Sequence, residues 1–333
     1  MNPLMETWGG MDIGGDLTLD GRTWEDAIPA GERLGGPSEW GNSRYKDFIQ
    51  CPWKYWVKHV RGLKPTPEHP RYEAIMRNLW IGGLYHEARA RYYLENLKHV
   101  DSHGTCISDK SQPEINEACA SAMFGIVDAA AEIQGFVATE ARRLLMGWMT
   151  LQGPGTVNDD RDATMYVENL LKTDYDGFPY TCRLDRVYWN ESLDGPVIQE
   201  HKTAGFYSES LLASYRTDPQ ILGQIYLWEH SDLRKEHGAL KAFEIDIAVK
   251  TKQREYYRER VPINLAAVED WADSMQHEWA LLQFCLASDS WPRRRANCFT
   301  WAKPCELHEV CADCGSLTKK SAIPGFKKLK KVK

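Results

Sequence analysis

The sequence predicts an α+β protein in which a central mixed β-sheet is flanked by helices. Three observations support this fold class. The first half has helical periodicity, residues 164–204 alternate apolar and polar side chains, and a second pair of strand-like segments at 240–263 lies between helical ones. The chain has 333 residues, of which 43% are hydrophobic and 26% are charged. That is enough for one large domain or two small ones.

The start of the chain is expected to be irregular and then helical. Residues 1–42 are rich in glycine and have no sustained period, which indicates an irregular leader. Ser43 is a suitable N-cap residue, and apolar and aromatic residues follow it at helical spacing until Pro52 interrupts them. We therefore expect two short helices that meet at Cys51.

The rest of the chain alternates between helical and extended segments. The expected elements are a helix at 72–98 around a glycine pair, one or two alanine-rich helices at 113–149, strands at 164–175, 178–189 and 195–204, a helical segment at 208–237, strands at 240–252 and 254–263, and an amphipathic helix at 265–288. Short turns separate the first three strands, so we expect them to form an antiparallel meander.

Charge is distributed unevenly along the chain. The formal net charge is −6, but the last fifteen residues contain seven lysines and no acid, and without these lysines 34 basic residues stand against 47 acidic ones. An acidic body excludes non-specific nucleic-acid binding along a whole face, so contact is expected in a local groove and at the basic tail, 315–333. A solvated terminus is the alternative for the tail.

The sequence gives no sign of export or of a membrane partner. It contains no run of 18 apolar residues, and its first twenty residues lack the order of a signal peptide. We therefore expect a cytoplasmic protein.

Two neighbouring strands are expected to bring acidic side chains together. Residues two apart share a face of a strand, so Glu200 and Lys202 point the same way. If the preceding hairpin turns at 190–195, a symmetric register pairs Asp185 with Glu200, at roughly 5 Å between their Cβ atoms. Two facing carboxylates repel each other unless a cation lies between them.

A hard divalent ion would resolve this repulsion. Mg²⁺ or Mn²⁺ binds carboxylates, water and substrate phosphate, and Lys202 would orient or activate the attacking water. The pattern therefore predicts phosphodiester hydrolysis. The alternative is a surface hairpin with a solvated acid and lysine, because this loose spacing also occurs by chance. Glu168, on the first strand, is expected to be an exposed strand residue rather than a member of the site.

Five segments of the chain occur in an order that is typical of one nuclease family. They are SRYKDFIQCPWKYWVKHVRGLKP, IGGLYHEARARYYLE, FPYTCRLDRVY, VIQEHKTA and DPQILGQIYLW. Together they resemble RecB-type PD-(D/E)XK nucleases, including AddB-like, CRISPR-adaptation and phage-encoded members with an iron-sulfur cluster. The resemblance spans about 43–314 and implies one nuclease domain with a restriction-endonuclease-like core. A long helical insert at about 97–160 and Trp228, where a tyrosine is expected, are departures from the pattern.

The resemblance implies roles for individual residues. The implied metal ligands are His86, Asp185, Glu200 and the backbone carbonyl of His201. Lys202 completes the catalytic set with the two acids. Gln220 and Gln224, one helical turn apart, are candidates for contact with substrate phosphate or with Lys202. Ordinary amide hydrogen bonding on a helix surface is the alternative for both glutamines.

Four of the nine cysteines lie within 298–314. In the nucleases that the chain resembles, three C-terminal cysteines and one distant N-terminal cysteine hold a [4Fe-4S] cluster. The ligands implied here are Cys51, Cys298, Cys305 and Cys311, with Cys314 as an alternative to Cys311. A zinc site made by the four C-terminal thiolates is the competing interpretation. The remaining cysteines are expected to be small buried residues.

The sequence thus predicts a metal-dependent DNA nuclease. It is expected to act as an exonuclease on DNA ends or single strands, in replication, recombination or repair. A non-catalytic iron-sulfur module that binds DNA and serves a helicase or recombination partner is the alternative, and a zinc-stabilised regulatory protein is a third. Trp53, Tyr55 and Trp56 are candidates for base stacking, with core packing as their alternative.

Overall fold

The structure of the protein is a computed structural model that describes most of the chain after residue 39. The described residues are 25, 28, 40–66, 69, 72–101, 105–152, 163–173, 177–250, 255–300, 303–313, 322–323 and 325–328. The predicted irregular leader, 1–42, lies almost wholly outside them. Within these described ranges, no helix is long and apolar enough to cross a membrane.

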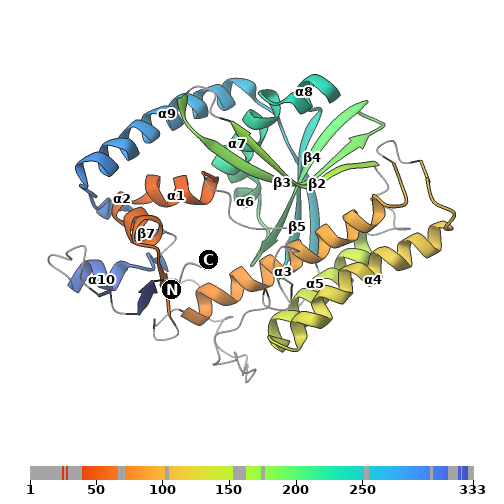
Figure 1. The fold of residues 1–333 in the computed structure, drawn as a ribbon, viewed down its shortest axis with the longest axis horizontal. Coiled ribbons are helices and arrows are strands. Elements are labelled where there is room, and N and C mark those ends of the chain that lie inside the picture. The colour runs from red at the N-terminus through yellow and green to blue at the C-terminus, as the bar shows by residue number, and fades with distance from the viewer. Residues whose placement is uncertain are drawn as a thin grey trace.

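A five-stranded mixed sheet forms the centre of the fold, which confirms the predicted fold class (Figure 1). Its strands, in the order in which they lie side by side, are β2 (Ala163–Thr173), β3 (Tyr180–Asn190), β4 (Gly195–Ala204), β5 (Ala242–Val249) and β6 (Glu255–Val261). The first three form the predicted antiparallel meander. β5 runs parallel to β4, and β6 runs antiparallel to β5.

One face of the sheet packs against α7 and α9. The helices after β4 are α6 (Glu209–Tyr215), α7 (Pro219–Glu229), α8 (Asp232–His237) and α9 (Leu265–Ser288). Ile198 and Phe243 of the sheet and Ile225 of α7 share one large buried core with α9. A Cβ atom at Gly223 would collide with the ring of Tyr180, so this glycine allows α7 to lie close to β3.

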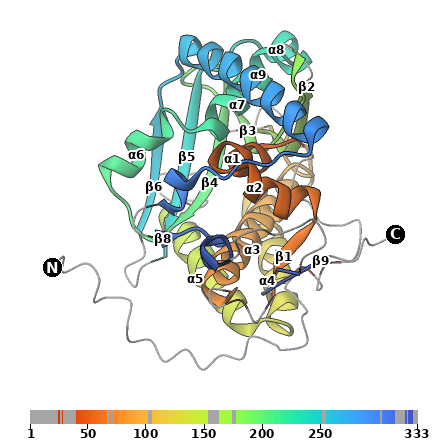
Figure 2. The same cartoon turned by 90° about the vertical axis from the view of Figure 1, so that its left-hand side faces the viewer.

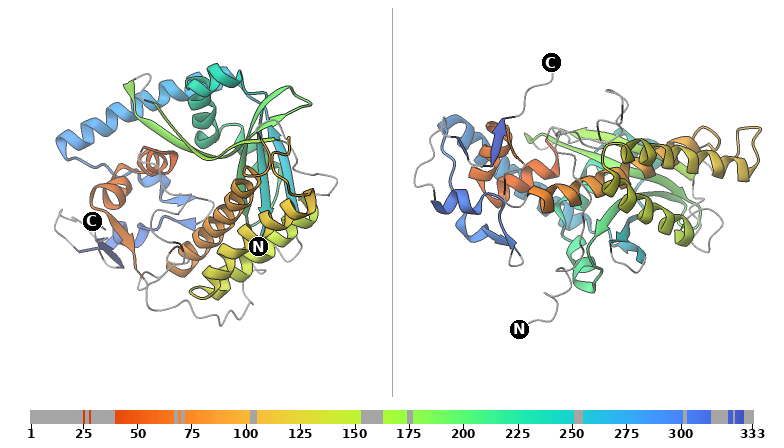
Figure 3. Two further views of the ribbon diagram at one scale, coloured as in Figure 1. Left: turned by 45° about the vertical axis from the view of Figure 1, so that its right-hand side comes forward. Right: turned by 90° about the horizontal axis from the view of Figure 1, so that it is seen from below.

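The opposite face of the sheet is covered by the helices that precede it (Figure 3). They are α3 (Tyr72–Asn96), α4 (Gln112–Ala131) and α5 (Gly135–Gln152). A capping box between Ser111 and Glu114 starts α4. The predicted insert therefore forms two helices that pack on α3. A buried ion pair fastens α3 to the sheet, since Arg89 Nη1 lies 2.6 Å from Asp246 Oδ2 of β5.

The two ends of the described chain meet beside this core. The elements are α1 (Asn42–Gln50), α2 (Pro52–Tyr55), a π-helical turn (Trp56–Val60), β1 (Leu63–Pro65), β7 (Phe299–Thr300), β8 (Lys303–Pro304), α10 (His308–Asp313) and β9 (Phe326–Lys328). As predicted, α1 and α2 meet at Cys51. β9 pairs with β1, below α2 in Figure 2, and Ile323 is buried. The described part of the basic tail therefore packs on the fold and is not a solvated terminus.

The aromatic residues of α2 and the following turn belong to the interior. Trp53, Tyr55 and Trp56 are all buried. Trp53 and Trp56 pack with Leu307 of the C-terminal segment. Core packing, the alternative given for these residues, is therefore what the structure shows.

Candidate active site

The candidate active site lies where β3 and β4 separate. From the hairpin turn, the ladder between them runs to the pair Arg186 and Gln199, in the register that the sequence predicts. One further step along this register brings Asp185 opposite Glu200. There Asp185 Oδ2 accepts a hydrogen bond from the backbone amide of His201 at 2.8 Å. The carboxylate thus occupies the place of a backbone partner, at the point where the strands diverge.

Glu200 and Lys202 face α7, on one side of the sheet. Lys202 Nζ donates to Glu200 Oε1 at 2.6 Å. From α7, Gln220 Nε2 donates to Glu200 Oε1 at 2.6 Å and Gln224 Nε2 donates to Glu200 Oε2 at 2.7 Å. Gln220 Oε1 also accepts from Lys202 at 2.8 Å. Asp218 caps α7 through the Gln220 amide, so the helix start positions both glutamines. The structure therefore brings both candidate glutamines to Glu200.

His86 reaches the site from α3, on the other side of the sheet. Its Nδ1 lies 3.3 Å from Asp185 Oδ2, and His201 Nδ1 lies 3.9 Å from the same oxygen. These three residues each offer one donor atom, and the three atoms lie within 4.8 Å of one another. The N–H and C=O groups of a strand residue point to the same edge. Because the His201 amide faces Asp185, its carbonyl also faces the opening between the strands.

Burial and mutual charge shift the pKa values of these groups. Burial, together with the negative charge of Asp185, raises the pKa of Glu200. Burial would also raise the pKa of Asp185, but His86, Lys202 and the His201 amide hold it below its usual value. Burial would lower the pKa of Lys202, but Glu200 raises it, so the lysine is an ammonium ion.

Glu168 belongs to this site, which corrects the expectation that it is an exposed strand residue. Its side chain is 10% exposed. The register of β2 and β3 places it opposite Asp185. Burial and the Asp185 charge raise the pKa of Glu168 to about 9. Its φ of 51° is a conformation that few residues other than glycine adopt, and such strain gathers at functional sites. In the sequence, a single glutamate in a strand of alternating residues gave no indication that the backbone bends at this position.

The chemistry of these donors fits a divalent cation. Three carboxylates, those of Glu168, Asp185 and Glu200, influence one another's pKa, and Lys202 is the cation in direct contact with Glu200. Burial and the negative charge of Asp185 raise the pKa values of Glu168 and Glu200, although Arg183 and Lys202 oppose these increases. Hard divalent ions bind such oxygen ligands.

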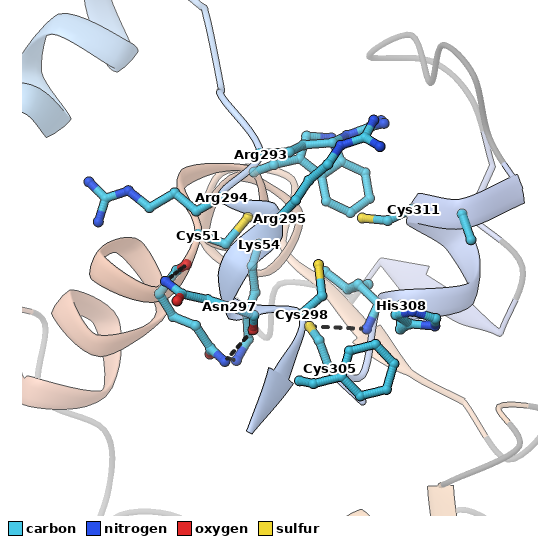
Figure 4. Close-up of a pocket in the computed structure, with 15 residues that line it drawn as sticks. Cys51, Lys54, Arg293, Arg294, Arg295, Asn297, Cys298, Cys305, His308 and Cys311 are labelled. Atoms are coloured by element: carbon cyan, nitrogen blue, oxygen red, sulfur yellow. Dashed lines mark hydrogen bonds between the residues drawn. The ribbon is translucent and has the colours of Figure 1, made fainter. Parts of the chain in front are cut away.

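A second candidate site is a cavity of about 280 Å³ where the two ends of the chain meet (Figure 4). Cys51 enters it from the joint of α1 and α2, Cys298 and Cys305 flank the β7–β8 hairpin, and Cys311 comes from α10. Figure 4 shows their sulfur atoms around one common space. The structure therefore brings together the four cysteines that the sequence selected. Cys314 lies outside the described residues.

The four thiols of this cavity could bind either one small ion or a cluster. Tetrahedral zinc with Zn–S bonds of about 2.3 Å needs sulfur atoms roughly 3.8 Å apart. In the described part of the chain, no three cysteine sulfurs lie within 4.8 Å of one another. Burial raises the pKa of Cys311 to about 11, and Cys51, Cys305 and Cys298 contribute to the increase. The four thiols thus line one cavity and lie close enough for their charges to interact.

The other described cysteines lie away from this cavity. Cys119, Cys182 and Cys285 are buried, as expected, but Cys106 is exposed, which corrects the expectation for that residue. It sits in the connection between α3 and α4, where its thiol lies beside Ser108.

Comparisons with known proteins identify one family. The model of the PD-(D/E)XK nuclease superfamily matches residues 39–312. No curated protein matches the chain. Among solved structures, the chain is similar to SSO0001, with 15% identity, a TM-score of 0.27, and coverage of 72% of this chain and 76% of that one. It is also similar to the "Putative exonuclease" from Eubacterium rectale, with 11% identity, a TM-score of 0.34, and coverage of 78% and 97%.

Proposed function

The chain belongs to the PD-(D/E)XK nuclease superfamily, whose members are metal-dependent phosphodiesterases, and from that premise we propose that it degrades DNA from ends or single strands with Mg²⁺ or Mn²⁺. One observation carries the proposal. Asp185, Glu200 and Lys202 come together where β3 and β4 separate, with His86 beside them. An exonuclease of this kind would act in replication, recombination or repair.

The residues of the site divide the work of hydrolysis. A divalent ion, when bound, polarises the phosphoryl oxygens and lowers the pKa of a bound water. Asp185, Glu200, His86 and the carbonyl of His201 would hold it. Lys202, kept charged by Glu200, donates hydrogen bonds from Nζ to the attacking water or to a phosphate oxygen.

Other groups keep this arrangement fixed. Gln220 and Gln224 hold the Glu200 carboxylate with two hydrogen bonds, so its orientation does not depend on the substrate. Gln220 also fixes Lys202 Nζ. A preorganised donor costs no reorganisation when the reaction occurs.

The decisive experiment is degradation of end-labelled DNA by protein purified without oxygen. Single-stranded, duplex and circular substrates with Mg²⁺ or Mn²⁺ distinguish exonuclease from endonuclease action. Glu200→Ala is expected to lower the rate by at least about 10²-fold. Glu244→Ala is the matched control, because Glu244 is a buried strand glutamate bound to Arg260 and Tyr188 rather than to the site.

The alternative is a non-catalytic module that binds DNA for a helicase or recombination partner. Such a module would have the same fold, but the wild type would then degrade no DNA or RNA under any of these conditions. Activity that survives in Glu200→Ala at the wild-type rate would also contradict the proposed site.

We further propose that the cysteine cavity holds a [4Fe-4S] cluster on Cys51, Cys298, Cys305 and Cys311. The shared cavity supports this proposal, because four thiolates are the usual ligand set of such a cluster. Protein purified without oxygen is expected to be brown, with four iron and four sulfide per chain. A colourless protein that contains one zinc per chain would contradict this assignment.

A further inference from the structure

The side chain of His201 lies on the opposite face of β4 from Glu200 and Lys202. Its imidazole is buried, with 2% of the residue exposed. The ring stacks on Tyr93 of α3, with centroids 5.8 Å apart and an interplanar angle of 24°. It meets the ring of His86 edge-on, with centroids 6.0 Å apart. A buried imidazole needs a partner for each ring nitrogen.

One partner fixes the tautomer of this imidazole. His201 Nε2 lies 3.3 Å from Gln199 Oε1. The same oxygen accepts a hydrogen bond from Arg186 Nη1 at 3.2 Å. Arginine can only donate, so the Gln199 amide must present its oxygen to it. The imidazole therefore donates from Nε2, and its Nδ1 carries a free electron pair.

Arg186 is itself held in place within the sheet. The residue is fully buried, its Nε donates to Thr164 Oγ1 at 3.0 Å, and its guanidinium lies over the rings of Tyr93 and Tyr188. The contacts from Arg186 through Gln199 to His201 thus run between buried side chains, and His201 Nδ1 lies on the side of Asp185.

The electron pair on His201 Nδ1 lies near other atoms that can donate an electron pair to a metal ion. His201 Nδ1 lies 3.9 Å from Asp185 Oδ2, and His86 Nδ1 lies 3.3 Å from the same atom. In octahedral coordination with bonds of about 2.1 Å, adjacent donors lie about 3.0 Å apart and opposite donors about 4.2 Å apart. These two separations are close to such donor–donor distances, and the three atoms lie within 4.8 Å of one another, so small side-chain movements bring all three to one ion.

We propose that the imidazole of His201 is a ligand of the metal site through Nδ1, in addition to its backbone carbonyl, and that Gln199 and Arg186 position it. This inference rests on the proposed function, since it concerns the same divalent ion. Two imidazole nitrogens make the site richer in nitrogen than a carboxylate site. Imidazole favours transition-metal ions over magnesium, so Mn²⁺ is the better fit.

The experiment uses Mn²⁺ alone as the probe of the full chain purified without oxygen. Electron spin echo envelope modulation counts the imidazole nitrogens on the ion, and calorimetry gives the Kd. We expect two imidazoles in the wild type and one in His201→Phe, which keeps the backbone carbonyl and the stacked ring. The Mn²⁺ Kd should rise about 10- to 100-fold, and the Mg²⁺ Kd should change less. His237→Phe is the control, because His237 bonds to Tyr166 outside the site.

Gln199 supplies a separate test of the positioning. Gln199→Leu removes the acceptor that fixes the tautomer, so the Mn²⁺ Kd should rise and the His201 modulation should weaken. Gln199→Glu keeps an acceptor oxygen, so its Mn²⁺ Kd and its His201 modulation should be close to those of the wild type. A purely structural role would lower the melting temperature in Gln199→Leu without changing the nitrogen count.

The possible failures are distinguishable. One coordinated imidazole in an active wild type, lost in His86→Phe and kept in His201→Phe, would overturn the inference and leave the proposed function intact. A wild type that binds no Mn²⁺ and degrades no DNA would remove both.

Discussion

The acidic site and the cysteine cavity each gather about four candidate ligands, but different forces place them. The acids stand on strands of one hydrogen-bonded sheet, between two large buried cores. The cysteines come from a helix joint, a two-residue hairpin and a six-residue helix, around a much smaller core. Backbone ladders position the first site, whereas side-chain packing and single hydrogen bonds between the two ends of the chain, such as Asn297 Nδ2 to the Gln50 carbonyl at 2.9 Å, position the second.

This difference indicates which site exists before it is filled. The strand ladder and the glutamines of α7 hold Asp185 and Glu200 at the opening through hydrogen bonds within the protein itself. At the cavity, Cys51 is separated from Cys298 by about 250 residues of chain. A cluster bound there would tie the ends of the domain together, so we expect its loss to change stability rather than chemistry.

The largest expected effect is therefore the loss of the proposed cluster. By the chain-entropy estimate, one cross-link that closes a loop of this length contributes about 5 kcal/mol. Cys305→Ser should lose the brown colour and lower the unfolding free energy of the terminal segments by about this amount. Urea unfolding followed by tryptophan fluorescence measures it, and limited proteolysis shows where the chain opens.

The sheet should survive this change. Mn²⁺ binding at the acidic site, measured in the same Cys305→Ser protein, is expected to persist at low temperature. If the variant instead loses sheet structure and metal binding together, the two regions are not independent, and the contrast drawn between them fails.

The buried ion pair between Arg89 and Asp246 gives the next largest effect. Breaking such a pair usually costs 3 to 5 kcal/mol, because an uncompensated charge stays buried. Arg258 Nη2 lies 3.5 Å from Asp246 Oδ2 and offsets part of the loss. Arg89→Met should therefore lower the free energy of unfolding, measured by urea denaturation, by about 3 kcal/mol. This would show that the sheet depends on its own internal contacts rather than on a bound group.

Two further variants sharpen this measurement. Replacing both partners, in Arg89→Met with Asp246→Leu, should recover much of the lost stability. Arg142→Met breaks a more exposed pair with Asp128 on the helical insert and should cost less than about 1 kcal/mol. Equal losses for the buried and the exposed pair would contradict the prediction.

A smaller effect is expected from the carboxyl group of Glu168, and it depends on pH. Its pKa rises from 4.5 to about 9 on folding. The folded protein therefore binds a proton that the unfolded chain releases, and this contribution to stability, complete below pH 4.5, is lost as the pH rises toward 9. In metal-free protein at pH 8.5, Glu168→Gln should raise the unfolding free energy by about 1 to 3 kcal/mol.

The pH dependence distinguishes this cause from a packing effect. The gain in Glu168→Gln should shrink toward pH 5, and Mn²⁺ should reverse it, because the ion stabilises the carboxylate in the wild type. Glu191→Gln, an exposed substitution at the hairpin turn, should change neither the pH dependence of the unfolding free energy nor its response to Mn²⁺. A gain of equal size at all pH values would indicate improved packing alone.

The same contrast explains what could be predicted from sequence. Strand alternation and a short hairpin turn determine which residues face each other, so the register that pairs Arg186 with Gln199 followed from spacing alone. The helical insert and the strands likewise have periods that depend on local sequence. The four cysteines were selected through the family resemblance and not from geometry, because they converge through long-range packing.

Glu168 and the side chain of His201 show the limit of this reasoning. Alternation along β4 places His201 on the face opposite Glu200, and yet its Nδ1 lies only 3.9 Å from Asp185 Oδ2. Glu168, whose φ is 51°, lies opposite Asp185 with its side chain buried. Both placements depend on backbone bends and on helix packing. The alternation of residue types along a strand gives no information about either.

The smallest expected effect separates the ligand cysteines from the others. Cys106 is exposed, and its thiol lies near the backbone of Ser108 and Lys110, far in sequence from the cavity. Cys106→Ser keeps a small polar side chain at the surface, so its unfolding free energy should stay within about 0.5 kcal/mol of the wild type. Iron and sulfide content should also remain unchanged. A brown colour lost in Cys106→Ser but retained in Cys305→Ser would show that the cluster ligands had been assigned to the wrong cysteines. It would also contradict the claim that the cavity, rather than the sheet, depends on what it binds.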